Sequence, residues 1–390
     1  MTHALKTTER LGVVDALRGF ALLAIVLLHN LEHYNLFLPL ECTLPLWVQT
    51  IDKYVWEILF FLFAGKAYAM FSLLFGFSFY IQFHNAEKRG IDFRGRFAWR
   101  LCLLFLFSQL HALFYNGDIL LLYAVVGFTL IPVCKLSDKA VFWIAFILLI
   151  QPYEWGRALY ALINPEYSPI TNRFVPYYEI AQEVTANGSF WEVLRSNITD
   201  GQLFSNIWQV ENGRLFQTTA LFMFGMLLGR RNYFIKSETS VRFWTKMLIG
   251  AILAFVPLYA LKVLVPGWIT NPSMVVPCGI AIPSYANFAL MVILVSSFIL
   301  LWFKKGTGGQ WQSFLIPYGR MSLTNYISQS IMGVVIYYGF GLSMYKFAGA
   351  TGSLLIGLLI FTLQLLFSRW WLVRHKHGPL EFLWRKGTWM

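Results

Sequence analysis

The sequence predicts an all-α polytopic integral membrane protein, a bundle of about ten transmembrane helices with both termini in the cytoplasm. Of the 390 residues, 57% are hydrophobic and 13% are charged, whereas soluble domains average about 25% charged residues. Apolar runs long enough to cross a bilayer recur throughout the chain. Basic residues gather in alternate connections between these runs, a distribution typical of cytoplasmic loops.

Hydropathy places the spans near residues 12–31, 57–83, 98–114, 118–134, 140–160, 215–229, 247–265, 284–303, 321–341 and 350–372. The second run is too long for one straight crossing. Residues 54–64 can therefore be interfacial or re-entrant, with 67–83 as the span itself.

Two connections on the predicted outer side are long. Residues 161–213 are acidic and rich in turn formers, so we expect short helices that cap the outer face of a single domain, 1–390. Residues 266–283 contain four prolines, and we expect irregular backbone there. Cys42 and Cys278 both fall on this side, which leaves a disulfide between them open.

The net charge of +12 would suggest a nucleic-acid partner in a soluble protein. Here the bias of basic residues toward cytoplasmic loops explains it, so we expect a lipid bilayer and no nucleic acid as partner. The four cysteines show no metal-ligand spacing, and we expect no metal site.

The first span carries charged side chains that lipid disfavours. His29 follows Arg18 by eleven positions, which places both within roughly 20° of one helix face and about 16 Å apart along the axis. Asp15 lies one turn below Arg18 and pairs with it in a purely structural interpretation. Asn30 and Glu32 follow as supporting residues. A neutral imidazole suits proton abstraction, so His29 is a candidate base.

A second candidate site lies in HALFYNGDILLLYA, residues 111–124. His111 ends one predicted span and Asp118 opens the next, across a turn at 116–117. A carboxylate beside a histidine fixes the imidazole tautomer. Asp118 can equally be the N-cap of the following helix, and the two roles are compatible.

Other buried or clustered polar residues are candidate ligands of a phosphate-bearing donor: Lys66, Arg100, Arg320 and Asn325. Lys66 is costly within an apolar run unless it is paired. Arg100 and Arg320 lie near the predicted inner surface, where cations can bind phosphates. The positive-inside bias would produce much of this cationic surface without a phosphate ligand.

Five blocks resemble the bacterial YeiB-like membrane proteins, a family with a domain of unknown function: DALRGFALL, GKAYAMFSLLFGFSF, HALFYNGDILLLYA, GRMSLTNYISQS and HGPLEFLWR. The resemblance covers nearly the whole chain. It implies membership of the transmembrane acyltransferases, beside the heparan-α-glucosaminide N-acetyltransferase group. The Arg18–His29 spacing is also similar to that of acyltransferases that modify bacterial surface polysaccharides. YeiB-like sequences often carry Asn at the position of His29, which makes His111 with Asp118 the alternative base.

These observations lead us to expect an acyltransferase in the bacterial cytoplasmic (inner) membrane. Its donor is acyl-coenzyme A, in particular acetyl-coenzyme A, bound from the basic inner side. Its acceptor is a hydroxyl or amine of a sugar or similar molecule on the outer side. No tightly bound cofactor is expected, and a homodimer is left open. Two alternatives remain: a transporter or channel that uses the buried charges as a relay, and a non-catalytic scaffold.

Overall fold

The computed structural model describes residues 11–32, 38, 40–164, 166–167, 171–305 and 311–389. All regular structure in these ranges is helical. The helices are α1 (Gly12–Glu32), α2 (Leu46–Phe63), α3 (Ala67–Glu87), α4 (Arg94–Ala112), α5 (Leu120–Gly127), α6 (Leu130–Val133), α7 (Asp138–Leu149), α8 (Pro152–Ile163), α9 (Val175–Asn187), α10 (Phe190–Ser196), η1 (Asn197–Gly201), α11 (Gln202–Glu211), α12 (Arg214–Arg230), α13 (Glu238–Trp268), α14 (Pro272–Lys305), η2 (Trp311–Leu315), α15 (Ile316–Arg320), α16 (Ser322–Tyr337), η3 (Met344–Lys346), α17 (Ala350–Arg374) and α18 (Pro379–Trp389).

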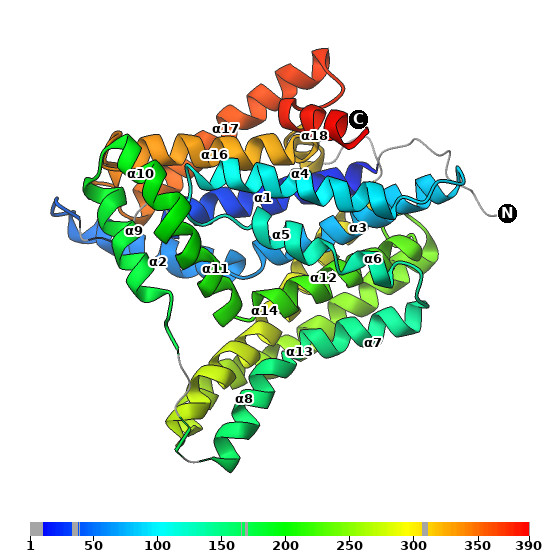
Figure 1. The fold of residues 1–390 in the computed structure, drawn as a ribbon, viewed down its shortest axis with the longest axis horizontal. Coiled ribbons are helices and arrows are strands. Elements are labelled where there is room, and N and C mark those ends of the chain that lie inside the picture. The colour runs from blue at the N-terminus through cyan, green and yellow to red at the C-terminus, as the bar shows by residue number, and fades with distance from the viewer. Residues whose placement is uncertain are drawn as a thin grey trace.

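Helix α1 runs through the centre of the bundle, where it packs against α3, α15 and α17 (Figure 1). Its apolar stretch is 72% buried, whereas that of α13 is 6% buried. A helix that is apolar all round but barely buried must be covered by lipid. Helix α1 is therefore a buried helix in the interior of the protein, and α13 faces the bilayer.

Within the described ranges, five segments are long and apolar enough to cross a membrane: Gly12–Glu32, Leu46–Glu87, Glu238–Trp268, Pro272–Lys304 and Ala350–Arg374. The predicted count of ten is not confirmed. Helices α12 and α16 have 17 and 16 residues, which is short for a straight crossing. The terminal orientation stays a prediction, and Lys6 and Arg10, which support it, lie outside the described residues.

Two predicted spans are broken. Residues 118–134 form α5 and α6 with a turn between them. Residues 140–160 divide at Gln151, which has a φ of 60° and is followed by Pro152 at the first position of α8. Proline is favourable there but cannot donate to the preceding turn.

The second predicted span is also two helices. Residues 54–63 are the last part of α2, and Ala64, Gly65 and Lys66 form the turn into α3. Gly65 has a φ of +78°, and a Cβ there would lie 2.7 Å from Asn287 Nδ2. Only glycine adopts this conformation at no steric cost, so Gly65 fixes where the two helices meet.

One expectation for the predicted outer side is wrong, and the disulfide that was left open there is not formed. Residues 266–283 are not irregular, because α13 extends to Trp268 and α14 begins at Pro272 with Pro277 and Pro283 inside it. Prolines can lie within helices in apolar surroundings, because neighbouring helices supply partners for the freed backbone groups. Cys42 and Cys278 are both free thiols. Between them in sequence, the short helices α9, α10, η1 and α11 lie at one end of the bundle (Figure 1).

Helices α3 and α12 cross at backbone contact distance. A Cβ on Gly76 would lie 1.9 Å from the Phe222 carbonyl oxygen, and one on Gly225 would lie 1.9 Å from the Leu73 carbonyl oxygen. We expect Gly225→Ala to lower the free energy of unfolding by about 1–3 kcal/mol or more, because the backbones must separate. Gly250→Ala, where nothing lies within 4 Å, should be neutral or stabilising. Thermal unfolding in detergent compares the two, and equal melting temperatures would contradict this crossing.

Candidate functional site

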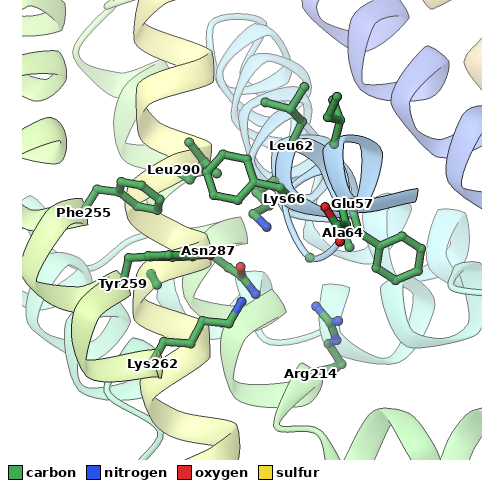
Figure 2. A pocket seen from close by; sticks show the side chains of 15 residues that line it. Glu57, Leu62, Ala64, Lys66, Arg214, Phe255, Tyr259, Lys262, Asn287 and Leu290 are labelled. Atoms are coloured by element: carbon green, nitrogen blue, oxygen red, sulfur yellow. The ribbon is translucent and has the colours of Figure 1, made fainter. Parts of the chain in front are cut away.

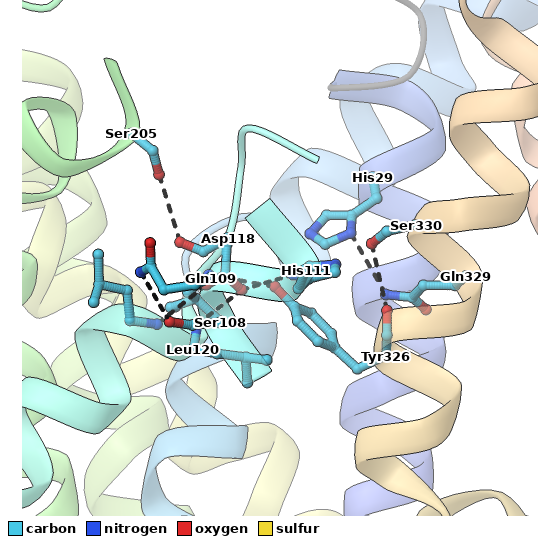
Figure 3. Close-up of polar contacts among 12 residues, drawn as sticks. His29, Ser108, Gln109, His111, Asp118, Leu120, Ser205, Tyr326, Gln329 and Ser330 are labelled. Atoms are coloured by element: carbon cyan, nitrogen blue, oxygen red, sulfur yellow. Dashed lines mark hydrogen bonds and ion pairs between the residues drawn. The ribbon is translucent and has the colours of Figure 1, made fainter. Parts of the chain in front are cut away.

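His111 and Asp118 form a buried pair at one end of the bundle (Figure 3). His111 Nδ1 lies 2.8 Å from Asp118 Oδ1, and neither side chain is more than 6% exposed. Asp118 also accepts hydrogen bonds from the backbone N–H groups of Leu120 and Leu121, at 3.0 and 3.1 Å. Asp118 therefore caps α5 and orients His111 at the same time.

His29 lies beside this pair on α1, with Nδ1 3.5 Å from Gln329 Nε2 of α16. Two tyrosine rings stand between the histidines. Tyr115 is centred 5.1 Å from His29 and 5.7 Å from His111, and Tyr326 is centred 6.1 and 5.0 Å from them. The two histidines that the sequence offered as alternatives thus belong to one site.

A cavity of about 460 Å³, here called the histidine cavity, opens beside His29. Asp118, Tyr326 and Tyr68 also line it, and α9 and α11 cover it with aromatic side chains. His29 is half-buried and borders the cavity, whereas His111 is fully buried and does not. The Nε2 atom of His111 has no hydrogen-bond partner among the described residues. His29 is therefore the imidazole that a ligand can reach.

A second cavity, of about 240 Å³, gathers three of the predicted donor ligands. Arg18, Arg100 and Arg320 all line it, and it is called the arginine cavity below. Helices α1 and α15 meet closely here, since a Cβ on Gly319 would lie 1.9 Å from the Asp15 carbonyl oxygen. This close approach brings Arg18 and Arg320 to the same space.

Each arginine of this cavity is held by a neighbour. Arg18 donates to Asp15 Oδ1 at 2.9 Å and to Ser78 Oγ. The Arg100 guanidinium lies 3.6 Å from the ring centre of Trp384 on α18, a cation–π contact. Arg320 donates to the carbonyl oxygen of Lys376 at 3.1 Å. The guanidinium groups are positioned in advance, which suits the binding of an anion.

The two cavities share three lining residues, Ile25, Ile119 and Tyr326. These three side chains form a thin partition between a cationic compartment and a compartment that contains a histidine. This adjacency is the central feature of the site.

The remaining predicted residues do not gather in one place. Asn325 is buried between helices and donates to the Tyr318 carbonyl oxygen and to Ser368 Oγ, so it packs α16 rather than facing a cavity. Asn30 is buried and donates to the Val26 carbonyl oxygen at 2.7 Å. Glu32 lines the histidine cavity. Lys66 lines neither of these cavities but a third one.

Comparisons with known proteins show a family match for part of the chain and similar proteins for nearly all of it. Residues 228–390 match the family model described as "Protein of unknown function (DUF418)". The uncharacterized protein YxaH of Bacillus subtilis (strain 168) is 29% identical over 98% of this chain and 95% of its own length. The uncharacterized protein YeiB of Escherichia coli (strain K12) is 26% identical over 97% of this chain and 96% of its own length. The chain is thus similar, over nearly its whole length, to YeiB-like proteins. No solved structure gives a significant match.

In this YeiB-like protein, three residues that line the cavities are not predicted from the sequence. Tyr326 is adjacent to the predicted Asn325, Trp384 lies within HGPLEFLWR, and Arg214 begins an apolar run. The sequence feature that could have indicated Arg214 is its charge at the start of a predicted span. Nothing local marked the two aromatic residues, because their role depends on helices distant in sequence.

Within the described part of this YeiB-like protein, no group of three His, Cys, Asp or Glu side chains could hold a metal ion. The charged groups of these cavities suit anions and proton transfer.

Proposed function

We propose that this protein is a bacterial cytoplasmic-membrane acyltransferase. It moves an acyl group, in particular acetyl, from acyl-coenzyme A to a hydroxyl or amine of a sugar or similar acceptor. The observation that carries the proposal is the partition of Ile25, Ile119 and Tyr326, which separates three arginines from His29. A reaction between an anionic donor and a neutral nucleophile needs these two environments side by side.

The donor occupies the arginine cavity. With a volume of about 240 Å³ the cavity is smaller than those that bury drug-sized ligands. It fits the narrow pantetheine arm and leaves the nucleotide at the mouth, near Arg100 and Arg320. Arg18, on α1, is the donor residue nearest to His29 in sequence. Its guanidinium is held at Asp15, on the side away from His29, so we assign to it the binding of an anionic group of the donor.

The acceptor occupies the histidine cavity. His29 removes a proton from its hydroxyl or amine, and the resulting lone pair attacks the thioester carbonyl carbon. Collapse of the tetrahedral intermediate breaks the C–S bond, and the thiolate takes up the proton that His29 holds. His111 and Asp118 touch neither substrate in this account. They position Tyr326, whose ring contacts both histidines.

The same partition also favours a second candidate, a transporter. Two cavities on either side of a thin barrier, with charged residues along the way, suit stepwise passage of an anion. Transport moves the ligand intact, whereas acyl transfer splits it. The fate of the thioester therefore separates the two candidates.

Donor binding is the first test of the proposal. We expect coenzyme A to protect the purified full-length protein against thermal unfolding, by about 2.7 kcal/mol at one hundred times its dissociation constant. ADP should protect far less, because it lacks the pantetheine arm. Protection should weaken as salt rises, since the cations at the mouth are partly exposed. Equal protection by ADP and coenzyme A, or none by either, would contradict the proposed donor.

A further inference from the structure

A third cavity lies where α2 turns into α3, between these helices and α12, α13 and α14. It has a volume of about 740 Å³ and is called the lysine cavity here. Lys66, Arg214 and Lys262 reach into it from three different helical regions, and Asn287 projects between them (Figure 2). The acyl-transfer proposal uses none of these cations.

The lysine cavity has a surplus of positive charge. Among its described lining residues, three are cations and one, Glu57, is a carboxylate. Glu57 forms no ion pair with Lys66, Arg214 or Lys262 in the part of the chain that the structure describes. Lys66 is 4% exposed, and its ammonium has no carboxylate partner among these residues. A buried charge without a partner is expensive, so the cavity is built for an anion.

The entrance of the cavity faces lipid. Ile58 and Phe61 on α2 line it and are 54% and 41% exposed. Phe255 lines it from α13, the helix whose apolar stretch is 6% buried. Exposed apolar side chains in such segments contact acyl chains. A ligand that enters here meets an apolar rim first and cations behind it.

We propose that the lysine cavity binds the phosphate-bearing headgroup of an anionic membrane lipid. The phosphate contacts Lys66, Lys262 and Arg214, Asn287 supplies an amide hydrogen-bond donor, and the acyl chains leave between α2 and α13. A soluble phosphate offers the same anion, but it would gain nothing from the apolar rim. The arrangement of cations behind lipid-facing side chains therefore favours the lipid.

The lysine cavity adjoins the histidine cavity. Phe60, Ala64, Gly65 and Arg214 line both. A lipid headgroup bound at the cations therefore extends toward His29, which makes a lipid-linked molecule the class of acceptor. This consequence rests on the proposed acyl transfer, whereas lipid binding does not.

The test measures lipid binding without donor or turnover. The full-length protein is placed in detergent micelles with phosphatidylglycerol or with phosphatidylcholine, and retained lipid is counted by native mass spectrometry. We expect preferential retention of phosphatidylglycerol. Lys262→Gln should lower its affinity roughly tenfold, because one charge-assisted hydrogen bond is lost. Lys262 is half-buried at the cavity wall, so this variant should fold normally. Lys66→Gln should lower the affinity at least as much.

Lys246→Gln is the matched control, since Lys246 is exposed on the same helix and lines no part of this cavity. It should retain the lipid as the unmodified protein does. Equal retention of both lipids, or equal loss in Lys246→Gln and Lys262→Gln, would overturn the proposal. Binding of inorganic phosphate as strong as that of phosphatidylglycerol in the same measurement would also overturn the proposal, in favour of a soluble anion. A protein that binds the lipid but transfers no acyl group would refute the acyl-transfer proposal alone.

Discussion

Replacement of His29 by alanine should leave coenzyme A binding intact and lower acyl transfer by about two to four orders of magnitude. A positioned general base contributes a factor of this size. His29 is the histidine that borders the cavity, whereas His111 is enclosed. His111→Ala should therefore have a milder effect, through the position of Tyr326. Steady-state transfer to a surrogate sugar, with donor affinity measured in parallel, checks both variants.

His84→Ala is the control for this comparison. His84 stacks on Tyr80 and lines neither the histidine nor the arginine cavity, so its loss should not change transfer.

A different pattern of activities among the variants would identify His111 as the base. If His111→Ala, Asp118→Asn and the double variant all fell to one low rate while His29→Ala stayed active, His111 and Asp118 would act as the catalytic unit.

Removal of two charges from the arginine cavity should have the second largest effect. We expect the double variant Arg100→Gln, Arg320→Gln to bind acyl-coenzyme A about a hundredfold more weakly, because two charge-assisted hydrogen bonds are lost. Turnover at saturating donor should change little, since neither residue lies at the reacting carbonyl. The salt dependence of donor affinity should become shallower. Calorimetry at two ionic strengths and the separate effects on KM and kcat measure these quantities.

Arg374→Gln is the matched control for the double variant. Arg374 is exposed at the end of α17 and lies outside the arginine cavity. It should leave donor affinity unchanged. A loss of affinity as large as that of the double variant would mean that the overall basic charge of this region attracts the donor, rather than a built cavity.

Local sequence patterns were enough for part of this site. The His111–Asp118 pair is separated by seven residues across a turn, so chain geometry alone brings the two side chains together. Arg18 and His29 share one helix face for the same reason. The arginine cavity could not be predicted in this way, because Arg100 and Arg320 line it from α4 and α15, two helices that are distant in sequence.

Sequence patterns did not predict the features that depend on packing between helices. Lys66 was grouped with the donor ligands by its charge, yet the turn at Gly65 directs it to another cavity. The prolines of 266–283 predict irregular backbone, but the structure has them within α13 and α14. Hydropathy also cannot show a break such as that at Gln151, where one residue in a left-handed conformation ends a helix.

The central claim is that an acyl group, and not the intact donor, passes from the arginine cavity to the histidine cavity. Membrane vesicles of known orientation test it directly, with acetyl-coenzyme A that carries a labelled acetyl group supplied on the predicted cytoplasmic side. The account predicts label on acceptor molecules at the opposite side and free coenzyme A thiol on the donor side, both lost in His29→Ala. Intact labelled acetyl-coenzyme A on the opposite side, with no free thiol released, would contradict it.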